Sequence, residues 1–258
     1  MASERPFIDF EGKTVLITGA GMGIGRVTAL ELAKLGARVV IGDVSVKRAS
    51  AVEKEIQAAH GEDRAMAIEC DVRDYDAVKT MIDDTLKKFG ALDVLINNAG
   101  AGKGGPFVKS KPEDWDLSLG VCLLGTMNCV HAVLPHMIER GQGRIVNCCS
   151  DAGRIGEPYL AVYSAAKAGI VGFTKAVAKE VGKKGVYLNC ACFGTTLTEV
   201  MQQIIPPEAR DKLSRSYALR RLGTMEDAAN VFILLASDRA SFVTGQVLSS
   251  SGGFSMVD

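Results

Sequence analysis

The sequence predicts an α/β fold: a doubly wound parallel sheet of about seven strands, with helices on both faces. Short apolar or β-branched runs alternate with longer segments that have a helical pattern, which is typical of βαβ units. The strand-like runs are almost continuously apolar, as strands covered on both faces must be. No Pro- or Ser-rich linker divides the chain, so we expect a single domain spanning residues 1–258.

The expected strands occupy residues 13–18, 38–43, 65–72, 92–100, 144–150, 186–193 and 246–252. Helices should end near residues 35, 60 and 89, and further helices should cover about 113–139, 159–181 and 226–235. A polar segment at about 195–218 is expected to close over a bound substrate as a lid. Because crossovers between parallel strands are right-handed, the loops after the strands should meet at one edge, where ligands bind.

The charge balance excludes several classes of protein. Thirty basic and thirty acidic residues give no net charge, which argues against a nucleic-acid binder or a polybasic membrane binder. No run reaches 18 apolar residues, and the first ten residues, MASERPFIDF, lack the apolar core of a secretory signal. We therefore expect a cytoplasmic protein with no nucleic-acid or membrane partner.

The cysteines and histidines do not indicate a metal site. Seven cysteines and three histidines occur without a Cys-x-x-Cys pair or other ligand spacing. Most of the cysteines lie in apolar runs, which is typical of buried free thiols in a reducing compartment.

A glycine cluster follows the first strand and precedes a helix. Gly19, Gly23 and Gly25 form a G-x-x-x-G-x-G pattern rather than the strict G-x-G-x-x-G spacing. Glycines at such a turn let backbone N–H groups approach a pyrophosphate, and the helix N-terminus favours negative charge. The strand–glycine–helix order predicts a dinucleotide site that includes Met22 and Ile24.

Two aspartates at strand ends extend this site. Asp43 follows the second strand and can bind both hydroxyls of an adenosine ribose, while it would repel the 2′-phosphate of NADP. Lys47 and Arg48 are interpreted as a solvated helix start, so the predicted cofactor is NAD. Asp71 can accept from the adenine amino group, or it can cap the helix that follows.

A second constellation lies farther along the chain. Ser150 ends the fifth strand, and Tyr163 and Lys167 are spaced i, i+4 on one helix face. An ammonium favours a nearby phenolate, so Lys167 should lower the pKa of Tyr163 and let it exchange a proton near neutral pH. Ser150 can then polarise the same alcohol or ketone oxygen while a hydride passes between the substrate carbon and the nicotinamide.

Together these motifs resemble the short-chain dehydrogenase/reductase family, in its single-domain, NAD-dependent branch with a Rossmann-type sheet. The resemblance covers all but about the first ten residues, through TGAGMGIG (18–25), CDV (70–72), NNAG (97–100), Ser150, YSAAK (163–167) and VTGQVLSSSGG (243–253).

The resemblance implies roles for particular residues. Ser150 would orient the substrate, Tyr163 would be the acid and base, and Lys167 would bind the nicotinamide ribose. The implied nucleotide contacts are Asp71 and Val72 on the adenine, Asn98, Ala99 and Gly100 on the ribose, and Gly194, Thr196 and Thr198 near the carboxamide. It also implies a homotetramer or homodimer, with a hetero-oligomer as a further possibility.

The chain departs from the family pattern at two positions. Cys122 stands where the family has an asparagine that holds a water of the proton relay, and a thiol is a weak hydrogen-bonding group. The relay then runs through backbone carbonyls and water, or it is impaired; Asn128 is too far around the helix to replace the amide. Phe193 stands where the family has proline, and we expect it to narrow the substrate pocket.

Phe107, Tyr159, Phe193 and Met201 are the candidate substrate contacts, and they favour an apolar, aromatic or cyclic secondary alcohol or ketone. An alternative is a cyclic or 3-hydroxyacyl-CoA of aromatic or alicyclic degradation. The resemblance of SDAGRIG (150–156) to dehydrogenases of that type suggests it, and a basic stretch at 210–221 could meet CoA phosphates. A third alternative, prompted by Cys122, is a catalytically weak NAD-binding partner subunit.

Overall fold

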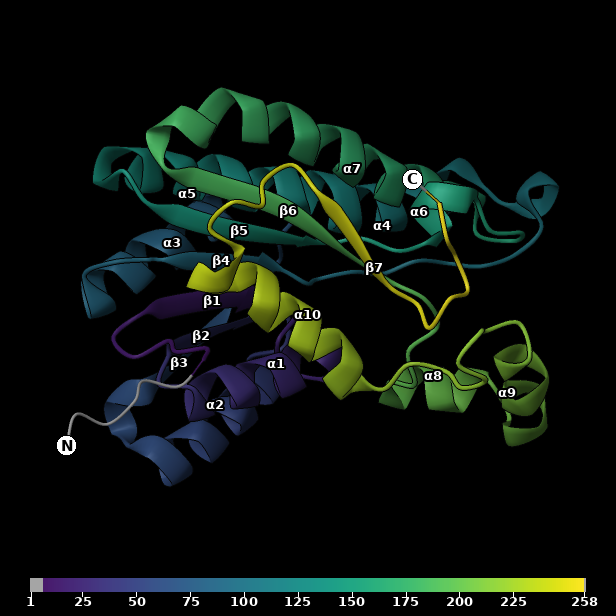
Figure 1. Cartoon of the computed structure of the whole chain (residues 1–258), viewed down its shortest axis with the longest axis horizontal. Coiled ribbons are helices and arrows are strands. Elements are labelled where there is room, and N and C mark those ends of the chain that lie inside the picture. The colour runs from purple at the N-terminus through teal and green to yellow at the C-terminus, as the bar shows by residue number, and fades with distance from the viewer. Residues whose placement is uncertain (1–6, 258) are drawn as a thin grey trace.

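A computed structural model of the chain describes residues 7–257. A seven-stranded parallel sheet, in the order β3-β2-β1-β4-β5-β6-β7, forms the middle layer (Figure 1). Its strands are β1 (Thr14–Thr18), β2 (Arg38–Asp43), β3 (Ala65–Glu69), β4 (Val94–Asn97), β5 (Gly143–Cys148), β6 (Val186–Phe193) and β7 (Val247–Ser250). The predicted doubly wound fold is confirmed. The first six residues of MASERPFIDF lie outside the described part.

Helices cover both faces of this sheet (Figure 1). One face carries α1 (Gly23–Lys34), α2 (Val46–His60) and α10 (Met225–Ala236), packed on alternate strand residues in one apolar cluster. The other face carries α3 (Tyr75–Phe89), α5 (Gly125–Arg140) and α7 (Ala161–Val181), packed on the intervening strand residues. Since side chains alternate along a strand, continuously apolar strands supply both cores at once.

Shorter helices surround the edge at which the strands end. They are α4 (Pro112–Ser118), α6 (Ala152–Ile155), α8 (Glu199–Ile204) and α9 (Pro207–Ser214). The predicted lid therefore consists of two short helices, which project at one end of the molecule (Figure 1). The third, fourth, fifth and seventh strands end two or three residues earlier than predicted, because the chain turns there into loops; Ser150 therefore follows the fifth strand and does not end it. The helix expected from residue 159 begins at Ala161, because Tyr159 has a φ of 68°.

The long helix predicted at 113–139 runs from Pro112 to Arg140, with a π-helical turn at Leu119–Leu124 between α4 and α5. It is long and apolar enough to cross a membrane by length and composition, with a mean hydropathy of 1.7 over an 18-residue window. Such a helix was not expected, because no run of the sequence reaches 18 apolar residues. In the fold, however, α5 packs against α3, β4 and β5, and Cys129, Val133 and Met137 on it are fully buried, as in a core helix of an α/β sheet.

Candidate active site

The glycine turn, residues 19–25, directly follows β1. The strand order reverses at β1, which lies between β2 and β4, and α/β sheets bind ligands at such a switch point. Gly19 has a φ of +62°, and a Cβ there would be 2.9 Å from the Ala99 Cα. A Cβ on Gly25 would be 2.5 Å from the Gly19 carbonyl oxygen and 2.6 Å from the Asn98 amide nitrogen. Side chains at these positions would disrupt the turn, so its glycines are required sterically.

Asn98 joins the turn to β4. Its side-chain amide donates to the carbonyls of Thr18 and Gly19, both at 3.0 Å, and its backbone N–H donates to the Thr18 hydroxyl. The Ala99 N–H donates to the same hydroxyl. The predicted nucleotide residues Asn98 and Ala99 therefore also stabilise the turn, and Thr18 is a structural partner that the sequence reasoning missed.

These residues fit a dinucleotide. Met22 is the N-cap of α1, its side chain makes no capping hydrogen bond, and the first turn holds no acidic residue. The N–H groups at this helix start can therefore face an anion such as a pyrophosphate. Gly23 has a φ of +58° and Ile24 is half-buried on α1, so the predicted turn residues come together around one helix N-terminus.

Asp43 is held beside this turn. Its carboxylate, which is 3% exposed, accepts hydrogen bonds from the N–H groups of Gly21 and Ser45, both at 2.9 Å. It also forms an ion pair with Arg48 at 2.8 Å. Arg48 is exposed at the start of α2, as expected, but its guanidinium also binds the aspartate expected to meet the ribose.

Asp71 does not cap a helix. The cap of α3 is Asp74, whose carboxylate accepts from two backbone N–H groups in the first turn. Asp71 instead pairs with Arg73, which holds the pKa of that carboxyl below its usual range through a side-chain hydrogen bond. Asn128, excluded above as a replacement for the relay amide, donates to the carbonyl of Val72 at 2.9 Å and so supports the predicted adenine end.

The structure brings the predicted catalytic side chains together. Lys167 is 1% exposed on α7, and its ammonium donates to the Cys148 carbonyl at the end of β5 at 2.7 Å. The same ammonium lies 5.6 Å from the ring centroid of Tyr163. Ser150 lies two residues beyond β5, where its hydroxyl accepts from the Ala152 N–H at 3.2 Å. β5 and α7 thus place all three side chains at the edge that also holds the glycine turn.

The Lys167 ammonium acts to lower the pKa of Tyr163, as expected, but burial has the larger and opposite effect. Burial raises the pKa of the phenol to about 12, and this effect exceeds the opposing effects of the Lys167 ammonium and of a hydrogen bond with Ser150. Burial also disfavours the Lys167 ammonium, but the negative charge that Tyr163 and the nearby thiols can carry raises the pKa of Lys167 overall. With a pKa of about 12, Tyr163 is a protonated phenol near neutral pH.

Cys122 lies in the π-helical turn and is fully buried. Its thiol donates to the Ala101 carbonyl at 3.2 Å, while its own carbonyl accepts from the Thr126 hydroxyl. A Cβ on Gly100 would be 3.8 Å from the Cys122 sulfur and 3.7 Å from the Lys167 nitrogen. Cys122 therefore lies beside the lysine, as the position of the family's asparagine implies, and it is bonded to a backbone carbonyl.

All seven cysteines are free, and six of them are buried, as expected. Within residues 7–257, no group of three or more His, Cys, Asp or Glu side chains is placed to hold a metal ion.

The start of the lid approaches the glycine turn. Thr198 is the N-cap of α8, and its methyl carbon would lie 3.5 Å from a Cβ on Gly23. Thr196 donates to the Gly194 carbonyl at 3.3 Å, which orders the segment between them. The Tyr217 hydroxyl, which the sequence reasoning did not single out, accepts from the Thr195 N–H at 2.9 Å and ties both ends of the lid together.

The candidate substrate residues fall into two groups. Phe107 and Tyr159 are 57% and 67% exposed, and their loops are joined by a hydrogen bond from the Gly105 N–H to the Tyr159 carbonyl; Met201 is half-buried on α8. Phe193 is 6% exposed and packs edge-on against Phe232 of α10, with ring centroids 5.1 Å apart.

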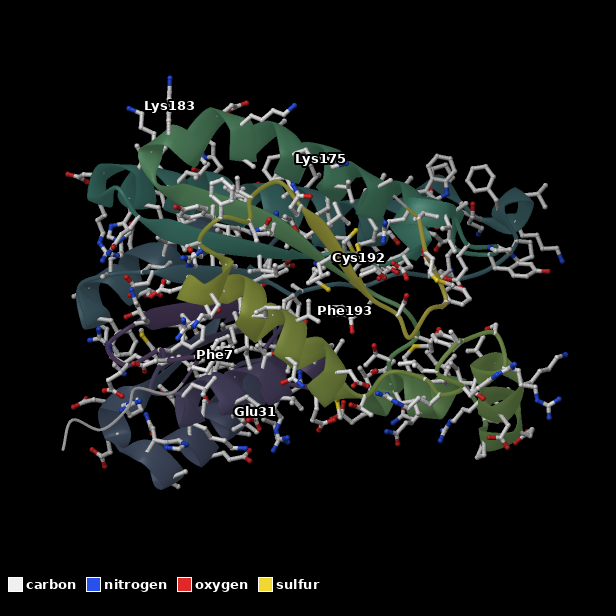
Figure 2. All side chains as sticks on the ribbon, viewed as in Figure 1. Phe7, Glu31, Lys175, Lys183, Cys192 and Phe193 are labelled. Atoms are coloured by element: carbon white, nitrogen blue, oxygen red, sulfur yellow. The ribbon has the colours of Figure 1, made fainter. Side chains whose placement is uncertain are left out.

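Figure 2 labels Phe193 beside Cys192 at the end of β6, and the two neighbours belong to apolar clusters on opposite faces of the sheet. The expectation that Phe193 narrows the substrate pocket is therefore corrected: its ring is part of the core under α10.

Two further glycines shape the catalytic edge, and the sequence reasoning missed both. A Cβ on Gly102 would be 2.9 Å from the Tyr163 ring, and one on Gly153 would be 2.7 Å from the backbone and Cβ of Lys167. The glycine-rich loop after β4 was the available signal for Gly102. Nothing in the sequence alone pairs Gly153 with α7.

Comparison with known proteins agrees with this geometry. The family model described as short chain dehydrogenase matches residues 13–209. The chain is 38% identical to the 3-oxoacyl-[acyl-carrier-protein] reductase FabG of Thermotoga maritima, over 94% of this chain and 98% of that protein. It is 39% identical to the (2S)-[(R)-hydroxy(phenyl)methyl]succinyl-CoA dehydrogenase subunit BbsD of Thauera aromatica, over 95% and 98%.

A solved structure, ElxO with NADP bound, superposes with a TM-score of 0.89 at 34% identity, over 94% of this chain and 98% of that one. The family match covers most of the chain, and these relatives match nearly all of it. The chain therefore belongs to the short-chain dehydrogenase family, whose members are oxidoreductases that bind a nicotinamide dinucleotide.

Proposed function

We propose that the protein interconverts a secondary alcohol and a ketone with NAD, and that the substrate is apolar, aromatic or cyclic. One observation carries the proposal: Ser150, Tyr163 and Lys167 meet at the same sheet edge as a glycine turn fitted to a dinucleotide. A proton-transfer group and a hydride carrier side by side are what this reaction requires.

When bound, the nicotinamide supplies or accepts the hydride. Tyr163 exchanges the proton with the substrate oxygen, and Ser150 donates a hydrogen bond to that oxygen. With a pKa of about 12, the phenol of Tyr163 is ready to protonate a ketone, while alcohol oxidation needs the Lys167 ammonium to stabilise the phenolate. The expected cofactor contacts are those of the glycine turn, Asp43, Asp71, Val72, Asn98, Ala99, Gly100, Tyr163, Lys167, Gly194, Thr196 and Thr198.

The preference for NAD over NADP rests on Asp43. Its buried carboxylate is fixed by two backbone N–H groups at the end of β2, where an adenosine ribose would lie. A fixed negative charge there attracts ribose hydroxyls and disfavours a 2′-phosphate. Because the similar ElxO structure has NADP bound, the preference for NAD is to be tested by measuring the binding of both dinucleotides.

A second candidate substrate is a hydroxyacyl or oxoacyl thioester. The names of two relatives favour it, since one reduces a 3-oxoacyl group on a carrier protein and the other oxidises a phenyl-bearing hydroxyacyl-CoA. In the predicted basic stretch, Arg221 pairs with Asp227 and Arg210 binds two backbone carbonyls, whereas Lys212 and Arg215 are exposed. Arg220 is exposed too, although its guanidinium donates to the Arg215 carbonyl at 2.7 Å, so Lys212, Arg215 and Arg220 are the side chains in that stretch that a CoA phosphate could meet.

We retain two further expectations as part of the proposal: a cytoplasmic homotetramer or homodimer, and no nucleic-acid or membrane partner. The catalytically weak partner subunit is disfavoured, because Ser150, Tyr163 and Lys167 are all present and lie together. Sedimentation of the purified protein measures the oligomeric state directly.

A spectrophotometric screen tests the function. NADH oxidation would be followed with an aryl ketone, a cyclic ketone and a 3-oxoacyl-CoA, each with and without protein. Turnover of the ketones supports the leading proposal, and turnover of the thioester alone supports the second candidate. If NADH binds tightly and none of the three is reduced, the partner-subunit alternative is favoured instead.

A further inference from the structure

Arg48 borders the adenosine end of the proposed dinucleotide site, and the mechanism above gives it no role. It lies in the first turn of α2, five residues after Asp43. A Cβ on Gly21 would be 2.6 Å from the Cβ of Arg48 and 2.8 Å from an oxygen of Asp43. Both side chains therefore border the same glycine of the phosphate turn.

The contact between Arg48 and Asp43 is close. The Nη2 and Nε atoms of Arg48 lie 2.8 Å and 3.3 Å from Oδ1 of Asp43. The same oxygen accepts from the Ser45 N–H, while Oδ2 accepts from the Gly21 N–H. Arg48 thus uses acceptor capacity that ribose hydroxyls would otherwise share, and it offsets the negative charge of the carboxylate.

The two partners differ in freedom to move. The Asp43 side chain is 3% exposed and held by backbone donors, whereas the Arg48 side chain is 44% exposed. An exposed guanidinium at the end of a flexible side chain can leave the carboxylate at little cost and turn towards another anion. Guanidinium groups match phosphate geometry especially well.

We propose that Arg48 moderates the discrimination against NADP that Asp43 provides. The inference rests on the proposed function, because it assumes that the adenosine ribose lies beside Asp43. Asp43 binds the ribose diol of NAD, and Arg48 offers its charge to a 2′-phosphate. The pair therefore lets the site prefer NAD while it still binds NADP, which an unpaired aspartate would reject.

Binding measurements test this without turnover. Isothermal titration of NADH and NADPH would be compared in the wild type, Arg48→Gln and Arg48→Lys. Arg48→Gln should weaken NADPH binding by about tenfold or more and change NADH binding by less than about threefold, since one charge opposite a phosphate is removed. Arg48→Lys keeps the charge and should retain most of the NADPH affinity.

Lys47→Gln is the matched control, because Lys47 precedes Arg48, is exposed, and forms no ion pair within residues 7–257. It should leave both affinities nearly unchanged. Equal losses for both dinucleotides in Arg48→Gln, or equal effects of the Lys47 and Arg48 variants, would overturn the inference. If the wild type binds neither NADH nor NADPH, the proposed function itself fails.

Discussion

The edge of the sheet has a nucleotide half, around the ends of β1 and β2, and a substrate half, formed by the loops after β4 and β5. The two halves are built differently. Around β1 and β2, the functional groups are backbone N–H groups and a carboxylate that is 3% exposed and fixed by several donors. Around the loops after β4 and β5, the candidate substrate residues Phe107 and Tyr159 are more than half exposed. The first half is preorganised for one kind of ligand, whereas the second presents side chains on connections that can vary.

The proposed catalytic residues lie between these two halves. Lys167 is as buried and fixed as the nucleotide residues, and Ser150 lies within two residues of β5. Their positions follow from the scaffold and not from the exposed loops. The scaffold therefore positions the proposed catalytic groups, whereas the exposed loops carry the proposed substrate contacts.

The largest effect is expected from Tyr163→Phe. The change removes the group that exchanges the proton with the substrate, so the rate constant kcat should fall by about 10²- to 10⁴-fold. NADH binding, measured by titration, should change little, because the nucleotide half is untouched. A variant with full activity would show that another group transfers the proton.

The second-largest effect is expected for the pKa of the Tyr163 phenol. Burial is the main cause that raises its pKa from 10.0, the ordinary value of a free phenol, to about 12, so its ionisation constant should be about a hundredfold below that of a free phenol. In an ultraviolet titration of the protein without dinucleotide, the difference between wild type and Tyr163→Phe should show no phenolate below about pH 10. A wild-type ionisation step near neutral pH would show that Lys167 outweighs burial.

Two helical glycines, one on α1 and one on α7, test whether the glycine turn is required sterically. Gly25 on α1 has no room for a Cβ, whereas a Cβ on Gly172 of α7 would meet nothing within 4 Å. Gly25→Ala should lower the free energy of unfolding by about 1–3 kcal/mol through overpacking and weaken NADH binding. Gly172→Ala should raise it by about 0.5–1 kcal/mol, since alanine favours the helix.

Thermal and urea unfolding measure both glycine variants on the same scale. Equal changes in stability for the two would contradict the steric role of the turn. Loss of stability in Gly25→Ala with unchanged NADH affinity would separate the packing of the turn from its proposed binding role.

The smallest effect is expected at Cys122. Its thiol already bonds a backbone carbonyl beside Lys167, and the relay can use such carbonyls, so Cys122→Asn should change kcat by less than about tenfold. The steady-state rate and the melting temperature together check this. Complete loss of activity in a folded variant would show that the π-helical turn is built around the thiol.

Much of the fold and of the nucleotide half could be predicted from the sequence, because local signals specify them. Continuous apolar strands predict a sheet that is covered on both faces, and the order strand, glycine cluster, helix predicts a phosphate-binding turn. The pair Tyr163 and Lys167 could be predicted for a similar reason, since residues spaced i, i+4 share a helix face.

The rest depends on contacts between distant segments. The side chain of Phe193 was expected to face the substrate pocket. Side chains alternate along β6, and this alternation directs the Phe193 ring to the sheet face that α10 covers, which a comparison of motifs does not reveal. The ion pair of Asp43 with Arg48, and the closeness of Gly153 to Lys167, arise only when the helices pack. The pKa of Tyr163 depends on burial, which the spacing of charges does not predict.

Isotope transfer tests the central claim most directly. Two samples of NADH would carry deuterium at the reactive ring carbon, each at one of its two stereochemical positions. Each sample would be supplied with the ketone or oxoacyl thioester that is found in the screen. We expect deuterium on the carbinol carbon of the alcohol formed, and about 10²- to 10⁴-fold slower formation of that alcohol in Tyr163→Phe. Alcohol product without deuterium on that carbon, from either position of label, would contradict hydride transfer at this site.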